Sequence, residues 1–163
     1  MITDRPRRLV GVSYVGYQRY FLTLCTAFRH AAFQSEDVVG GVLEQLRQTC
    51  SFCAFANTAY CFMPDHLHVL ATAQSESADL EEFVKRFKQS TGFMYRKNHG
   101  QRLWQPGYHD RVLRDDEATE AVARYVLANP VRAGLTKELG EYPFAGSDVY
   151  SLTELLTAWE KQT

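Results

Sequence analysis

The sequence lacks the features that mark several classes of protein. It has no apolar run long enough to span a membrane, and its amino terminus is too polar for a signal peptide. It contains no GxxxxGK[ST] loop for nucleotide phosphates. No repeat, low-complexity run or Pro/Ser-rich linker divides the chain. These absences favour a single cytoplasmic domain over residues 1–163, without membrane association.

Cysteine is also scarce, and its spacing does not predict a metal or redox site. There are four cysteines, of which Cys50 and Cys53 have CxxC spacing. A zinc site would need a second ligand pair at matching spacing, and none exists. A thioredoxin-like pair would follow a strand and open a helix, whereas this pair closes a helical pattern. We therefore expect reduced structural thiols in a cytosolic protein.

An excess of positive charge is absent too, because 18 basic residues face 19 acidic ones. The distribution is uneven, however, since no Asp or Glu occurs between residues 85 and 102. Basic side chains interleaved with aromatic ones suit single-stranded DNA, although a solvated helix face would have the same composition. A basic arm, residues 1–11, could reach a hairpin stem or guanine edges. The predicted DNA-binding residues are Arg5, Arg7, Arg8, Lys85, Lys88, Arg96, Lys97, Arg102 and Trp104.

The apolar spacing predicts alternating strands and helices. Expected strands cover residues 20–28, 53–63, 66–73 and 102–114, and expected helices cover 35–50, 77–98 and 115–130. Ser35 and Ser77 are the expected caps of the first two helices, and Pro130 is expected to end the third. This order predicts an α+β fold, a ferredoxin-like antiparallel sheet with packed helices. A carboxy-terminal tail, residues 141–163, follows.

Two histidines stand inside the apolar run Tyr60–Leu70. Because side chains alternate along a strand, His66 and His68 share one face, while Leu67 and Val69 share the other. Their Cα atoms would lie about 6–7 Å apart, so both rings could converge on one cation. A polar sheet face with two solvated histidines is the alternative. Two ligands hold a metal weakly, so a third would be needed.

A nucleophile and a third ligand could come from one later helix. Tyr125 and Asn129 are four residues apart and would share a helix face. A phenol becomes a nucleophile when it is deprotonated or hydrogen-bonded to a base, and an amide oxygen is a hard ligand for a divalent cation. The alternative is that Asn129 and Pro130 form an ordinary helix stop.

Three blocks of this sequence resemble a known family in their order and spacing. They are "MPDHLHVL", "LWQPGYHDRVLR" and "YVLANPVRAGL". The chain, over roughly residues 14–145, resembles the single-tyrosine HUH transposases, named for two histidines that flank a hydrophobic residue, and most of all their REP-associated branch. The resemblance implies that His66 and His68 bind Mg²⁺ or Mn²⁺, with Asn129 as third ligand and Tyr125 as nucleophile. In the insertion-sequence branch a glutamine is more usual at the position of Asn129.

The resemblance also implies a reaction and a substrate. Single-stranded DNA would be cleaved and rejoined through a 5′-phosphotyrosine intermediate, with REP-type hairpins as the target. Because a phenol is largely protonated at neutral pH, a metal-bound water or a base must assist. His109 and Asp110 are candidates for that base, and a solvated strand end is the other interpretation of this pair.

Two other functions and two oligomeric states stay open. A non-catalytic nucleic-acid-binding module could use the same fold, although no RNP-type aromatic strand is present. A metallonuclease could activate water instead of tyrosine. Insertion-sequence relatives act as homodimers, but the tail could cover the domain and support a monomer, which we prefer. The apolar residues of this tail are spaced as on one face of a helix, and they are Leu152, Leu155, Leu156 and Trp159.

Overall fold

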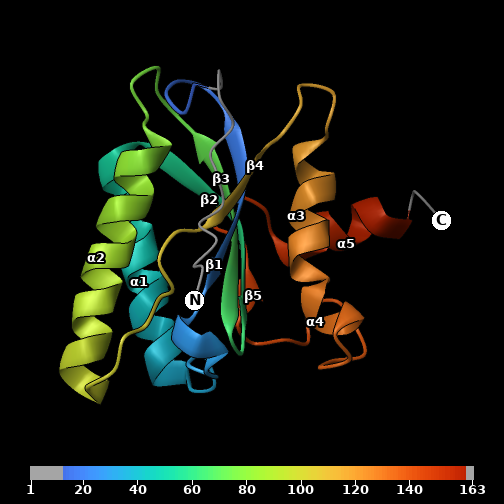
Figure 1. The fold of residues 1–163 in the computed structure, drawn as a ribbon. Coiled ribbons are helices and arrows are strands. Elements are labelled where there is room, and N and C mark those ends of the chain that lie inside the picture. Colours follow the sequence, from blue (N-terminus) through green and yellow to red (C-terminus); the bar gives the residue numbers. More distant parts are fainter. Residues whose placement is uncertain (1–12, 161–163) are drawn as a thin grey trace.

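The computed structural model describes residues 13–160, so the basic arm with Arg5, Arg7 and Arg8 lies outside the described part. One antiparallel sheet of five strands, in the order β4-β1-β3-β2-β5, carries helices on both faces (Figure 1). The elements are β1 Arg19–Cys25, η1 Ala27–Arg29, α1 Glu36–Cys53, β2 Phe55–Met63, β3 His66–Ala73, α2 Leu80–His99, β4 His109–Val112, α3 Thr119–Leu127, α4 Asn129–Arg132, β5 Ala145–Gly146 and α5 Leu152–Glu160. The predicted α+β class with an antiparallel sheet is confirmed.

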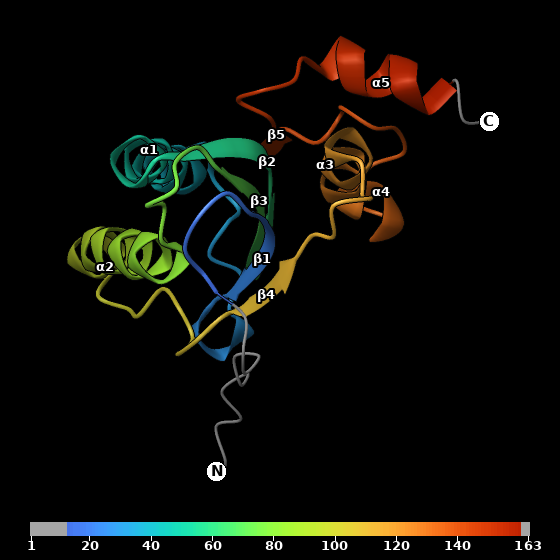
Figure 2. The ribbon, with the colours of Figure 1, turned by 90° about the horizontal axis from the view of Figure 1, so that it is seen from above.

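The larger core lies between the sheet and the helices α1 and α2, which lie side by side on one face (Figure 2). Burial alternates along strand β1, with Tyr20, Leu22 and Leu24 buried in this core. Leu67 and Val69 of β3 join them and are fully buried. Every second residue of both strands therefore points to the opposite face, where α3 lies.

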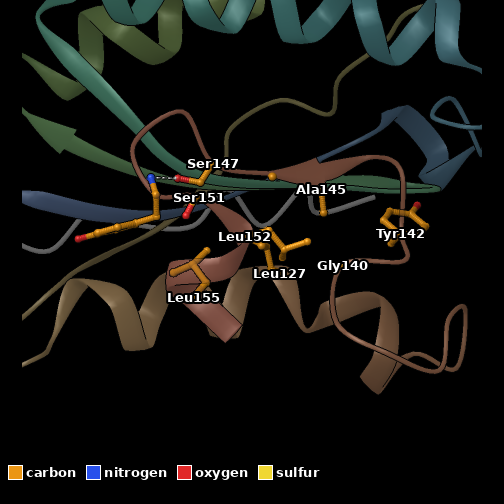
Figure 3. A pocket seen from close by; sticks show the side chains of 10 residues that line it. Leu127, Gly140, Tyr142, Ala145, Ser147, Ser151, Leu152 and Leu155 are labelled. Carbon is orange, nitrogen blue, oxygen red and sulfur yellow. Dashed lines mark hydrogen bonds between the residues drawn. The ribbon is translucent and has the colours of Figure 1, made fainter. Parts of the chain in front are cut away.

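A smaller core lies on that opposite face. Leu70 of β3 and Cys61 of β2 pack there against Val126 of α3. Helix α5 closes the layer through Leu155, and a hollow of about 270 Å³ opens beneath it, between α3, α5 and β5 (Figure 3). The tail thus covers part of the domain, as expected. The side chain of Trp159 lies outside the described part.

Several predicted boundaries are wrong for local reasons. The first strand ends at Cys25, because the chain turns into η1, where Phe28 has φ 56°. Helix α2 is capped by Asp79 and not by Ser77, since the Asp79 carboxylate accepts from the amides of Glu81 and Glu82. The strand expected over 102–114 shortens to β4.

The predicted third helix is also divided, because α3 ends at Leu127 and α4 begins at Asn129. Pro130 lies in the first turn of α4, where the missing N–H of a proline costs nothing. Within residues 13–160, no helix combines the length and the apolar character that a membrane crossing requires.

Candidate active site

His66 and His68 converge as predicted, on the face of β3 that is covered by α3. Their Nε2 atoms are 3.2 Å apart, and their ring centroids are 4.7 Å apart. The turn at Pro64 and Asp65 that joins β2 to β3 places the pair at the start of its strand. Two ring nitrogens are therefore presented at one point.

The outer nitrogen of each ring is held by a neighbour. His66 Nδ1 donates to the Asp65 carboxylate at 2.7 Å, and Asp65 is held in turn by Arg29 at 3.0 Å. His68 Nδ1 lies 2.9 Å from the hydroxyl oxygen of Thr23. Because the carboxylate engages Nδ1 of His66, Nε2 is the nitrogen that faces His68. Histidines that bind metals are oriented by such partners.

Asp65 and Thr23 were not identified from the sequence. Asp65 had a signal, since it directly precedes the histidine pair at the junction of two expected strands. Thr23 had none, because its position beside His68 depends on the register between β1 and β3.

Burial keeps His68 neutral. It lowers the pKa of His68 to about 4, and the neighbouring His66 and the cations Arg132 and Arg29 act in the same direction, against a backbone hydrogen bond with Leu22. The neutral form is the one that binds metals.

Asp65 keeps its charge. Although burial opposes ionisation, the hydrogen bonds from His66 and Arg29 hold the pKa of Asp65 below its usual value. The site therefore combines the neutral imidazole of His68 with the ionised carboxylate of Asp65, which is hydrogen-bonded to His66.

The pair fits part of a coordination sphere for a divalent cation. Adjacent ligands of an octahedral ion at 2.0–2.2 Å are about 3 Å apart, close to the separation of the two Nε2 atoms. In the described part of the chain, no third His, Cys, Asp or Glu completes such a group. Asn129 donates through Nδ2 to the carbonyl of Val126 at 3.0 Å, which directs its Oδ1 away from the end of α3. The role of this oxygen as the third ligand stays a prediction.

Tyr125 lies on the same face in the same chain. Its side chain is 55% exposed, and its ring meets Phe21 edge-on with centroids 6.1 Å apart. Phe21 stacks on His68 at 5.2 Å. On the outer side, Arg132 covers the tyrosine ring. A continuous row of rings within this chain therefore runs from the tyrosine to the histidine pair.

Of the two candidate bases, only His109 belongs to this face. His109 pairs with Thr23, and Thr23 pairs with His68, so all three side chains point to one side of the sheet. Asp110 pairs with Leu22 and points to the opposite side. Asp110 is therefore excluded as a candidate base, and His109 stays a candidate.

The predicted DNA-binding residues between Lys85 and Arg102, here called the basic track, lie on α2 and just after it. They are on the opposite face of the sheet from His66 and His68 (Figure 1). Lys88 is already engaged, since its ammonium donates to the carbonyls of Gln105 and Gly107 at 2.7 Å. The exposed members of the track are Lys85, Arg96, Lys97 and Arg102.

Trp104 does not form a surface for stacking bases. Its side chain is only 5% exposed and packs against Phe33 and Phe87. Its Nε1 donates to the buried hydroxyl of Thr91 at 2.8 Å. The prediction of Trp104 as a DNA-binding residue is therefore wrong. An exposed aromatic of this surface is Phe93, beside an open hollow that Arg96 and Arg102 also line.

The chain is similar to known transposases in sequence and in fold. The family model for IS200-like transposases matches residues 14–129. A putative REP-associated tyrosine transposase of Haemophilus influenzae is 21% identical over 137 residues, which is 77% of either chain. The ISDra2 transposase TnpA of Deinococcus radiodurans is 29% identical over 125 residues, which is 71% of this chain and 86% of that protein.

A solved structure of a REP-associated tyrosine transposase bound to a REP hairpin has a TM-score of 0.69 at 18% identity. The match covers 85% of this chain and 82% of the other, and it shows the shared fold. The segment that matches the family model contains His66, His68, Tyr125 and Asn129. The chain therefore belongs to the IS200-like transposase family, a family of DNA-transposing enzymes, as its three sequence blocks predicted.

Proposed function

We propose that this transposase cleaves and rejoins single-stranded DNA through a covalent bond between Tyr125 and a 5′-phosphate. The observation that carries the proposal is the row of rings from Tyr125 through Phe21 to His68. It joins an exposed phenol to a pair of imidazoles whose Nε2 atoms face each other.

His66, His68 and the Oδ1 of Asn129 would hold a divalent cation. When bound, the cation withdraws charge from a phosphate and orients it for substitution. Imidazole nitrogens suit transition metals better than Mg²⁺, which prefers oxygen, so we expect Mn²⁺ to bind more tightly than Mg²⁺. Asp65 and Thr23 keep the rings in place, and burial keeps His68 in its neutral form.

Tyr125 supplies the nucleophile. Its phenol oxygen forms a bond to phosphorus while the bond from phosphorus to the 3′-oxygen breaks. The phenol loses its proton, the departing 3′-oxygen gains one, and the 5′-phosphate stays esterified to Tyr125. A 3′-hydroxyl can reverse the exchange, so no ATP is needed. His109, on the same face, is the candidate for moving these protons.

The substrate is single-stranded DNA that carries a hairpin. Two observations support this proposal: the chain shares its fold with a transposase bound to a REP hairpin, and α2 presents exposed basic side chains. Lys85, Arg96, Lys97 and Arg102 would contact phosphates. The basic arm with Arg5, Arg7 and Arg8 stays a prediction. The ring contacts from Tyr125 through Phe21 to His68 lie within one chain, which supports a monomer.

The test is covalent capture on hairpin DNA with a single-stranded flank and Mn²⁺. Wild-type protein should form a complex that survives denaturation, and Tyr125→Phe should form none while it still binds the DNA. Tyr17→Phe is a matched control, because Tyr17 is another exposed tyrosine. The double variant His66→Ala/His68→Ala should form no covalent complex, with or without the divalent cation.

Three outcomes would contradict the proposal in different ways. Capture by Tyr125→Phe would exclude this residue as the nucleophile. DNA nicking that forms no covalent complex, and that persists in Tyr125→Phe, would indicate a metallonuclease that uses water. Binding of hairpin DNA without cleavage under any divalent cation would indicate a binding module.

A further inference from the structure

Arg132 lies directly on the proposed nucleophile. Its Cζ atom is 3.9 Å from the centroid of the Tyr125 ring, and one of its terminal N–H groups donates to the Tyr125 carbonyl at 2.9 Å. The short helix α4 brings this side chain back over α3. The phenol ring thus has the guanidinium over its face and a T-shaped contact with Phe21.

The charge of Arg132 also reaches the sheet. It contributes to lowering the pKa of His68, and it opposes the effect of burial on the pKa of Cys61. His68 and Cys61 are paired neighbours on β3 and β2. The guanidinium therefore acts on the tyrosine and on the histidine face together.

No carboxylate in the described part of the chain neutralises Arg132. The ion pairs there involve Arg29, Arg47, Arg86, Arg111 and His66. A guanidinium keeps its donors in the plane of the group, so its face can cover a ring while its edge donates to an anion. The edge of Arg132 makes one bond, to the Tyr125 carbonyl, and keeps further N–H groups for a ligand.

We propose that Arg132 is a phosphate-binding residue of this site, which orients the Tyr125 ring with its face and receives a non-bridging oxygen of the scissile phosphate on its edge. The inference rests on the proposed function. The same contact would serve both directions of the reaction, because the phosphate remains beside Arg132 when it is esterified to Tyr125. Lysine offers a point charge without the planar fork, so it could replace only part of this role.

The test is single-turnover capture on saturating hairpin DNA with Mn²⁺. Arg132→Ala should slow capture by about 10²- to 10³-fold, the usual effect of losing one donor to a developing anion. Arg132→Lys should be intermediate. Added guanidinium ion at millimolar concentration should restore at least tenfold to Arg132→Ala and should leave the wild type unchanged. A structural role would not respond to guanidinium.

Arg86→Ala is the matched control. Arg86 makes the same kind of contact, with its Cζ 4.0 Å from the ring of Phe52, on the other face of the sheet. Arg86 is paired with Glu82 and is not among the proposed phosphate contacts, so Arg86→Ala should capture saturating hairpin DNA at the wild-type rate.

Two results would overturn the inference. One is capture by Arg132→Ala within threefold of the wild type. The other is a slow Arg132→Ala that guanidinium does not rescue and whose melting temperature has fallen, which would show that Arg132 only fastens α4. If wild-type protein forms no adduct with Tyr125, the proposed function itself fails. If it does form one and Arg132→Ala forms it equally fast, only the role of Arg132 fails.

Discussion

Acidification should destabilise this protein through one residue, His68. The pKa of this imidazole is lowered from 6.5 to about 4, first by burial and then by the neighbouring His66 and by Arg132 and Arg29. Between these two values the unfolded chain binds a proton at His68 and the native protein does not. The free energy of unfolding rises with pH wherever the unfolded state binds more protons.

The sign and the size of the effect follow directly. The contribution is fully present above pH 6.5 and is lost as the pH falls towards 4. A difference of about 2.5 pKa units at 1.36 kcal/mol each gives about 3 kcal/mol in total, of which about 2 kcal/mol is lost between pH 7.5 and 5. That is a large share of the 5–15 kcal/mol typical of a domain. Asp65, whose pKa lies below 3.8, contributes only at lower pH.

The assay is urea unfolding at pH 7.5, 6 and 5, with a chelator present, for the wild type and His68→Asn. The free energy of unfolding of the wild type should fall by about 2 kcal/mol more than that of His68→Asn over this range. His99→Asn is the control, since His99 is exposed at the end of α2, and it should follow the wild type. Equal pH slopes for wild type and His68→Asn would refute the reasoning.

Two further substitutions test the surroundings of the histidine pair. Asp65→Ala removes the acceptor of His66 Nδ1 and should weaken Mn²⁺ binding by about 10- to 100-fold in isothermal titration, whereas an unchanged affinity would show that Asp65 does not orient the ring. Phe28→Asn places a residue that tolerates positive φ at a position where the ring is 95% exposed, and it should raise the free energy of unfolding by about 0.5–1 kcal/mol in urea titration. A fall would mean that the ring of Phe28 makes a stabilising contact.

The shared face of His66 and His68 could be predicted from sequence because it depends only on the two-residue period of a strand. The hairpin that places the pair at a strand start was equally local, since Pro64 and Asp65 mark the turn. The positions of Thr23 and Phe21 beside His68 could not be predicted from the sequence. A periodic pattern shows which face a residue points to, but not which strand lies beside it, and the pairing of β1 with β3 joins residues more than 40 positions apart.

Trp104 shows how composition misleads. An aromatic next to a basic segment resembles a stacking surface for bases, and the sequence does not reveal whether a core will take it instead. Here the rings of Phe33 and Phe87 surround the indole, and Thr91 accepts its N–H. The hydroxyl decides the outcome, since a buried indole N–H without an acceptor would be costly.

The position of Arg132 depends on the helix break that the sequence suggested only as a stop. Because Pro130 has no N–H, the carbonyl of Val126 loses its partner in a continuing helix. The side chain of Asn129 donates to that carbonyl, and Arg132 donates to the carbonyl of Tyr125. The two side chains that satisfy the end of α3 are thereby held beside the proposed nucleophile. Ending one helix and starting another within two residues thus brings Arg132 back over the ring of Tyr125, whereas in an uninterrupted helix it would lie about two turns further along.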